Sequence, residues 1–78
     1  MVRVVAVRPV RDFVLELSFS NGETREVDVD RYLHGAVFDA LRADPALFRA
    51  VRVDGALGTI VWPTGADLCP DVLFAIDR

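Results

Sequence analysis

Two alternating segments joined by an Asn-Gly turn constrain this sequence most strongly. Residues 13–19 alternate between apolar and polar side chains, which is typical of a strand buried on one face. Residues 23–29 alternate again after the turn, so the pattern predicts an antiparallel hairpin. The apolar positions of its first strand are Phe13, Leu15, Leu17 and Phe19.

The register of this hairpin follows from the need to place both apolar faces on the same side. A two-residue Asn-Gly loop would set Leu15 opposite Asp28, so that apolar side chains of one strand would lie beside charged side chains of the other. A three-residue loop over residues 20–22, with Gly22 in the left-handed conformation, pairs Leu15 with Val27 instead. We therefore predict the three-residue loop.

A first strand and a second hairpin complete the predicted β-structure. Residues 2–8 are rich in β-branched side chains, and Pro9 predicts the end of this strand because proline cannot donate to a sheet ladder. Residues 51–62 predict a second hairpin around a four-residue loop. With Val53 opposite Ile60, its apolar side chains share one face.

Helical spacing replaces the alternation after Asp30. Gly35 is expected to divide a short first turn from a main helix. Asp44 and Pro45 then predict a new helix start, because aspartate is a favoured cap and proline suits the first helical position. The apolar residues at these helical positions are Leu33, Val37, Phe38, Leu41, Leu47 and Phe48.

A last helix is predicted to open at Pro70, with Asp67 or Cys69 near its cap. The elements together predict an α+β fold with an N-terminal three-strand antiparallel meander, short helices, a second β-hairpin and a C-terminal helix. Because the sequence has 78 residues and no linker-like segment, we expect one domain over residues 1–78. The apolar positions of the last helix are Val72, Leu73 and Ile76.

The charge balance argues against direct binding to nucleic acid. Nine arginines oppose twelve carboxylates, which gives a net charge of -3, and the arginines are scattered. Duplex binding draws on clustered basic residues, so no direct nucleic-acid partner is expected. The sequence has no signal peptide and no apolar run of about 18 residues, which predicts a cytoplasmic protein without a membrane partner.

The single cysteine and the single histidine limit what catalysis or metal binding is available. One cysteine makes no internal disulfide, and no Cys/His pattern has the spacing of a zinc site. Cys69 and His34 could pair as nucleophile and base; alternatively, Cys69 is a small apolar residue or weak cap, and His34 a solvated side chain. We expect no catalytic, cofactor-binding or metal-binding residue, no cofactor and no enzyme activity.

Four stretches carry a resemblance to a known family: residues 19–29, Phe38 with Leu41, residues 51–54 and residues 58–68. The last of them, Gly-Thr-Ile-Val-Trp-Pro-Thr-Gly-Ala-Asp-Leu, is the most specific. With these stretches the chain resembles, over nearly its whole length, the bacterial family catalogued as domain of unknown function 2442. The resemblance implies a compact α+β fold and no known reaction.

The resemblance also implies a gene setting. Members of that family are sometimes found with a helix-turn-helix segment appended, and they are often encoded beside another small uncharacterised protein. This sequence ends at Arg78, a few residues after its last predicted helix begins. We therefore expect no appended DNA-binding segment here.

The segment after the second hairpin has two interpretations. Trp62 is either an ordinary core residue or, with Pro63 and Thr64, part of a small binding surface, because tryptophan is enriched at interface hot spots. Asp67 either orients a ligand or caps the last helix.

Exposed apolar side chains point to a partner or to self-association. A chain this small leaves some apolar residues outside the core, and Tyr32, Leu57 and Phe74 are the candidates because they lie at element ends or a loop tip. Open sheet edges offer a second route to assembly, unless charge or proline blocks them. The carboxylates expected on the outer face of the first hairpin either attract a basic partner or are simply solvated; they are Glu16, Glu26 and Asp28.

Three functions follow in order of preference. The first is a protein-interaction or regulatory module, for example an antitoxin-like one, that binds an unidentified protein partner or a second copy of itself. The second is a nucleic-acid-associated regulator that acts through a partner, and the third is a small-ligand-binding domain with a pocket near Trp62 and Asp67.

Overall fold

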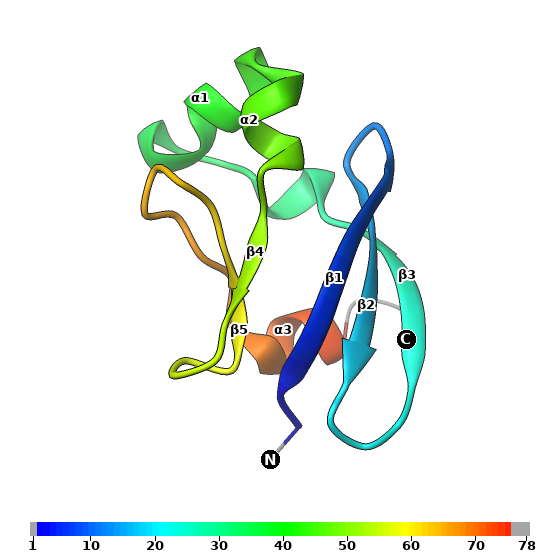
Figure 1. Cartoon of the computed structure of the whole chain (residues 1–78). Coiled ribbons are helices and arrows are strands. Elements are labelled where there is room, and N and C mark those ends of the chain that lie inside the picture. The colour runs from blue at the N-terminus through cyan, green and yellow to red at the C-terminus, as the bar shows by residue number, and fades with distance from the viewer. Residues whose placement is uncertain (1, 76–78) are drawn as a thin grey trace.

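The first three strands form one antiparallel sheet. The computed structural model describes residues 2–75, and in it β1 (Val4–Arg11), β2 (Val14–Phe19) and β3 (Thr24–Asp28) lie in the order β1-β2-β3 (Figure 1). This sheet is the three-strand meander that the sequence predicts.

The hairpin of β2 and β3 has the predicted three-residue loop. Leu15 lies opposite Val27, and the Phe19 N–H donates to the Glu23 carbonyl oxygen at 2.8 Å. Gly22 has φ of 90°, a backbone conformation that glycine adopts without steric cost. The apolar side chains of both strands therefore lie on the same face of the hairpin, as predicted.

The prediction that the first strand ends at Pro9 is wrong. β1 continues to Arg11, and Pro9 pairs with Leu15 of β2. β1 is an edge strand of its sheet, where proline is tolerated because ladder bonds are needed on one side only. The register shifts between Pro9 and Arg11, so the pairing of β1 with β2 is irregular directly after the proline.

The helices begin at the predicted signals. A short 3-10 helix, η1 (Asp30–Tyr32), precedes α1 (Ala36–Ala43), and Gly35 caps α1 with φ of 86°. α2 (Pro45–Arg49) starts after Asp44, whose carboxylate accepts the N–H groups of Ala46 and Leu47 at 3.0 and 3.4 Å. Val37, in contrast, lies on the solvent side of α1 and is 61% exposed.

The second hairpin and the last helix complete the fold. β4 (Arg52–Asp54) pairs with β5 (Thr59–Val61) in the predicted register, with Val53 opposite Ile60. α3 (Pro70–Ala75) follows, and the Leu73 N–H donates to the Cys69 carbonyl oxygen, so Cys69 rather than Asp67 occupies the capping position. Ile76, predicted in this helix, lies outside the described residues.

One core joins these elements. Figure 1 shows α1 and α2 at one end of the molecule, beside the turn between β1 and β2, and α3 toward the opposite end. None of the helices described within residues 2–75 has the length and hydropathy that a membrane-spanning helix requires. The largest fully buried side chains are Trp62, Phe48, Leu15, Leu17, Leu33, Leu41, Ile60 and Leu73.

Candidate functional site

The structure places Trp62 in the core. Its side chain is 1% exposed, and the indole N–H donates to the Phe48 carbonyl oxygen at 2.9 Å. The indole plane lies tilted against the Phe48 ring and meets the Phe38 ring edge-on at 6.3 Å. Of the two interpretations of Trp62, the core one therefore accounts for its contacts.

The residues after Trp62 form a tight exposed turn. The Gly65 N–H donates to the Trp62 carbonyl oxygen at 2.9 Å, and Pro63 and Thr64 lie exposed at the tip. Asp67 forms an isolated antiparallel bridge with Val61, and its side chain is exposed. Within residues 2–75 the Asp67 carboxylate has no hydrogen-bond partner, so the geometry gives it neither a capping contact nor a neighbour that would orient a ligand.

The three apolar candidates lie on separate elements. Leu57 is 55% exposed in the loop between β4 and β5. Tyr32 in η1 and Phe74 in α3 are instead partly buried against the core. The structure thus brings Pro63, Thr64 and Asp67 together on one turn. It leaves the other three candidates apart: Tyr32 in η1, Leu57 in the β4–β5 loop and Phe74 in α3.

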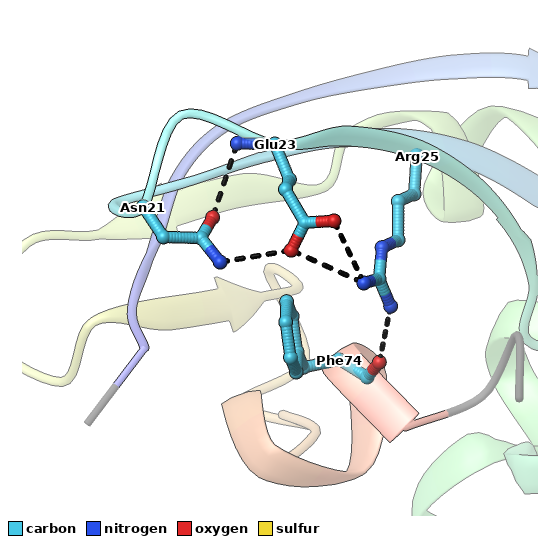
Figure 2. Close-up of polar contacts among 4 residues, drawn as sticks. All are labelled: Asn21, Glu23, Arg25 and Phe74. Atoms are coloured by element: carbon cyan, nitrogen blue, oxygen red, sulfur yellow. Dashed lines mark hydrogen bonds and ion pairs between the residues drawn. The ribbon is translucent and has the colours of Figure 1, made fainter.

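Phe74 belongs to a network that fastens α3 to the first hairpin (Figure 2). Arg25 donates one hydrogen bond to the Phe74 carbonyl oxygen at 2.6 Å and two to the Glu23 carboxylate at 3.0 and 3.1 Å. Asn21 holds Glu23 from the turn, at 2.8 Å through its side-chain amide. The Phe74 ring also meets the Phe19 ring edge to face at 5.2 Å, so Phe74 is partly buried where α3 contacts the first hairpin.

The outer face of the sheet carries paired charges. The hydrogen bond and the charge of Glu16 raise the pKa of Arg8 on the neighbouring strand. The Arg11 guanidinium on β1 lies 3.6 Å from the Glu26 carboxylate on β3, across the central strand. Two of the three carboxylates predicted on this face therefore have a basic neighbour on β1, whereas Asp28 accepts the Asp30 N–H at 3.0 Å.

A cavity that the sequence analysis did not anticipate lies between the β1–β2 turn and helices α1 and α2. Its volume is about 240 Å³. The floor is apolar, because the Phe13 and Phe48 rings meet edge to face at 5.2 Å beside Leu41. The lining residues are Asp12, Phe13, Leu41, Arg42, Pro45, Phe48 and Arg49.

Two arginines border the cavity in different states. Arg42 is held in place, since it forms an ion pair with Asp30 and lies 5.1 Å from the Phe13 ring centroid. Arg49, at the end of α2, is exposed and has no ion pair or hydrogen bond to its side chain among residues 2–75. Arg49 is therefore the charge at this cavity that is available to a ligand.

Asp12 and Arg49 also line a second, smaller cavity. It measures about 40 Å³, and Pro9, Val10 and Arg11 complete its lining. Asp12 has φ of 41° in the β1–β2 turn, a left-handed conformation that aspartate tolerates better than most residues. The two cavities thus share an ionic rim above an apolar floor.

The residues suited to metal binding or nucleophilic chemistry do not gather. Within the described part of the chain, no group of three or more His, Cys, Asp or Glu side chains is placed to hold a metal ion. His34 precedes α1 and Cys69 precedes α3, and both are exposed. Neither lines a cavity described above.

The comparison with known proteins identifies a family but adds no activity. The family model described as "Protein of unknown function (DUF2442)" matches residues 4–78. No curated protein and no solved structure matches the chain. The match covers all of the strands and helices described here, from β1 to α3. The chain therefore belongs to the DUF2442 family of proteins of unknown function.

Proposed function

We propose that this protein is a non-enzymatic interaction module that binds a segment of a partner protein in the cavity between the β1–β2 turn and α1–α2. The segment presents an apolar side chain to the floor and a carboxylate to Arg49. The observation that carries the proposal is the apolar cavity with an arginine at its rim that has no partner within residues 2–75.

The size of the cavity favours a side chain over a cofactor. Small-molecule sites occupy roughly 300–1,000 Å³. The cavity here measures about 240 Å³ and is open to the surface, which fits one or two side chains of a protein segment better. A small-ligand domain is therefore the weaker alternative.

Two arginines, Arg42 and Arg49, outnumber the single carboxylate of Asp12 at the rim, and this balance favours a carboxylate on the ligand. A guanidinium can hold both carboxylate oxygens through two parallel hydrogen bonds, which fixes orientation as well as attraction. Arg42 already donates to Asp30, so it shapes the wall and contributes less new attraction. Arg49 supplies the unused donors.

The finer role we propose for this module is regulatory: it holds a partner protein that is encoded beside it. The gene arrangement implied by the family resemblance supports this role, as does a site suited to binding. Co-expression of the chain with the adjacent gene product, followed by size-exclusion chromatography, is expected to yield a stoichiometric complex. Separate elution of two folded proteins contradicts the regulatory role but leaves the cavity proposal standing.

A fragment titration tests the cavity directly. The probes are N-acetyl-leucine and N-acetyl-leucinamide, which share the apolar side chain and differ only in the carboxylate. In ¹H–¹⁵N NMR spectra we expect N-acetyl-leucine to shift the amides of Phe13, Leu41 and Arg49, and the amide probe to bind several-fold more weakly.

Two variants serve as test and control. Arg49→Ala is expected to abolish the preference for the acid, whereas Arg52→Ala, another exposed arginine on β4, retains it. Equal binding of the two probes to the native chain contradicts the assignment of Arg49. Shifts confined to residues outside the cavity contradict the site.

A further inference from the structure

The outer edge of β3 carries an unused row of backbone hydrogen-bonding groups. β3 is the last strand of the sheet order β1-β2-β3, and in Figure 1 it has β2 on one side only. An edge strand of this kind is a template on which another chain can add a strand.

The register identifies which groups point outward. The Phe19 N–H donates to the Glu23 carbonyl oxygen, and the Val29 N–H donates to the Phe13 carbonyl oxygen, so the odd-numbered residues of β3 bond to β2. Successive residues of a strand direct their N–H and C=O groups to opposite sides. The residues that face away from β2 are therefore Thr24, Glu26 and Asp28.

These backbone groups have no partner in the described chain. Among residues 2–75, no N–H or C=O group of the three outward residues makes a backbone hydrogen bond. β1, at the other edge of the sheet, is partly occupied, because the Val4 N–H donates to the Gly58 carbonyl oxygen at 2.9 Å. β3 thus offers three consecutive outward residues whose backbone groups have no backbone partner among residues 2–75.

The side chains of the same three residues give this edge its charge. Thr24, Glu26 and Asp28 are all exposed, whereas Arg25 and Val27 point to the opposite face and are partly or fully buried. The contact of Arg11 with Glu26 spans 3.6 Å and leaves the Glu26 side chain 51% exposed. The edge therefore presents carboxylates to an incoming strand.

This charge disfavours a second copy of the chain. Antiparallel pairing of two β3 strands that aligns all of the outward residues places Glu26 directly opposite Glu26 of the other copy. Like charges directly opposed across a strand pair are destabilising. A strand with basic side chains at the facing positions gains attraction there instead.

We propose that β3 accepts a strand from a partner protein by β-augmentation, and that this strand alternates basic with apolar side chains. Its basic residues lie beside Glu26 and Asp28, and its apolar residues continue the face that carries Val27. The site is independent of the cavity, because no residue of β3 lines it.

Amide hydrogen exchange measured by NMR tests this inference. The probe is the peptide acetyl-Lys-Val-Lys-Val-Lys-amide, and its control carries the same side chains with N-methylated lysine backbones, which cannot donate to a ladder. We expect the probe to slow exchange at the amides of Thr24, Glu26 and Asp28 at least tenfold. The amides of Arg25 and Val27, already bonded to β2, should change little.

Protein variants separate the backbone from the charge contribution. Glu26→Pro removes an outward N–H without touching the β2–β3 ladder and is expected to abolish the protection. Glu26→Gln is expected to weaken peptide binding about two- to fivefold, as for an exposed charge pair. Glu16→Gln is the matched control, since Glu16 lies on the same face but in the central strand.

Three outcomes overturn the inference. The first is equal protection by the N-methylated peptide, which shows that ladder bonds are not formed. The second is unchanged binding of the probe to Glu26→Gln, which removes the charge argument. The third is a dimer of the native chain, detected by analytical ultracentrifugation, that protects the β3 amides, because the occupant is then a second copy. Fragment binding at the cavity bears on none of these results.

Discussion

The guanidinium of Arg25 lies 4.1 Å from the ring centroid of Phe74 and also donates to the Phe74 carbonyl oxygen. One side chain thus binds both the ring and the last turn of α3, while its other nitrogen holds Glu23. A basic group near the C-terminal end of a helix interacts favourably with the helix dipole. The contact fixes α3 on the first hairpin.

Replacement of Arg25 is therefore expected to loosen α3. Arg25→Ala removes the hydrogen bonds and the stacking on Phe74, and the free energy of unfolding should fall by about 1–3 kcal/mol. Arg25→Lys should recover only part of this loss, since an ammonium lacks the planar fork of a guanidinium. Urea denaturation followed by circular dichroism measures both.

Arg52→Ala is the control for this experiment, because surface substitutions of this kind usually change stability by less than about 0.5 kcal/mol. If Arg25→Ala is as stable as Arg52→Ala, the network in Figure 2 does not hold α3.

The cap at Asp44 gives a second prediction. Its carboxylate accepts the N–H groups of Ala46 and Leu47, which have no intrahelical acceptor at the start of α2. Asp44→Ala should lower the free energy of unfolding by about 0.5–2 kcal/mol, and Asp44→Asn should keep most of it. Thermal unfolding of the two variants decides the matter: equal losses would mean that the charge, not the cap geometry, stabilises α2.

The sequence predicted a strand register or a helix start correctly where a single local requirement determines it. Alternation and a shared apolar face set the register of Leu15 with Val27, and the Asp44-Pro45 pair set the start of α2. Pro9 misled because its tolerance depends on β1 being an edge strand, which is a property of the sheet and not of the local sequence.

The candidate site was less accessible to sequence reasoning. The cavity joins residues from the β1–β2 turn and from two helices, and only the packing of these elements brings Phe13 and Phe48 into contact. A possible signal was the Asp12 turn between two strands of a meander. Arg42 forms an ion pair with Asp30, whereas Arg49 is left to bind a ligand. No local sequence pattern indicates which of the two arginines pairs with Asp30.

Two glycines in the β4–β5 loop provide a matched pair for a third prediction. Gly58 has φ of 70°, and a methyl group there would lie 2.7 Å from the Arg3 side chain. Gly55 has open space around it. Gly58→Ala should cost roughly 1–2 kcal/mol, because the left-handed conformation is unfavourable for alanine and Arg3 must move. Gly55→Ala should change stability little or raise it slightly.

Chemical denaturation of the two glycine variants checks this difference. Equal midpoints would show that the loop relaxes freely. They would also show that the contact of Arg3 with the loop, including its 2.6 Å hydrogen bond to the Gly55 carbonyl oxygen, does not restrain the conformation at Gly58.

The last prediction concerns the buried indole of Trp62. Trp62→Phe removes the hydrogen bond to the Phe48 carbonyl oxygen and leaves a gap beside α2. That oxygen also accepts the Val51 N–H at 3.3 Å, so it is not left wholly unpaired. We therefore expect a loss of about 1 kcal/mol for the bond and of similar size for the lost volume, or roughly 2 kcal/mol in all. Circular dichroism in urea measures this loss, because the variant no longer has the single tryptophan of the sequence as a fluorescent probe.

Tyr32→Phe is the control. It also removes a polar atom from a partly buried aromatic residue, but the Tyr32 hydroxyl has no hydrogen bond within residues 2–75. A Trp62→Phe variant no less stable than this control would mean that the bond to Phe48 adds nothing to the core, and that Trp62 is retained for another reason.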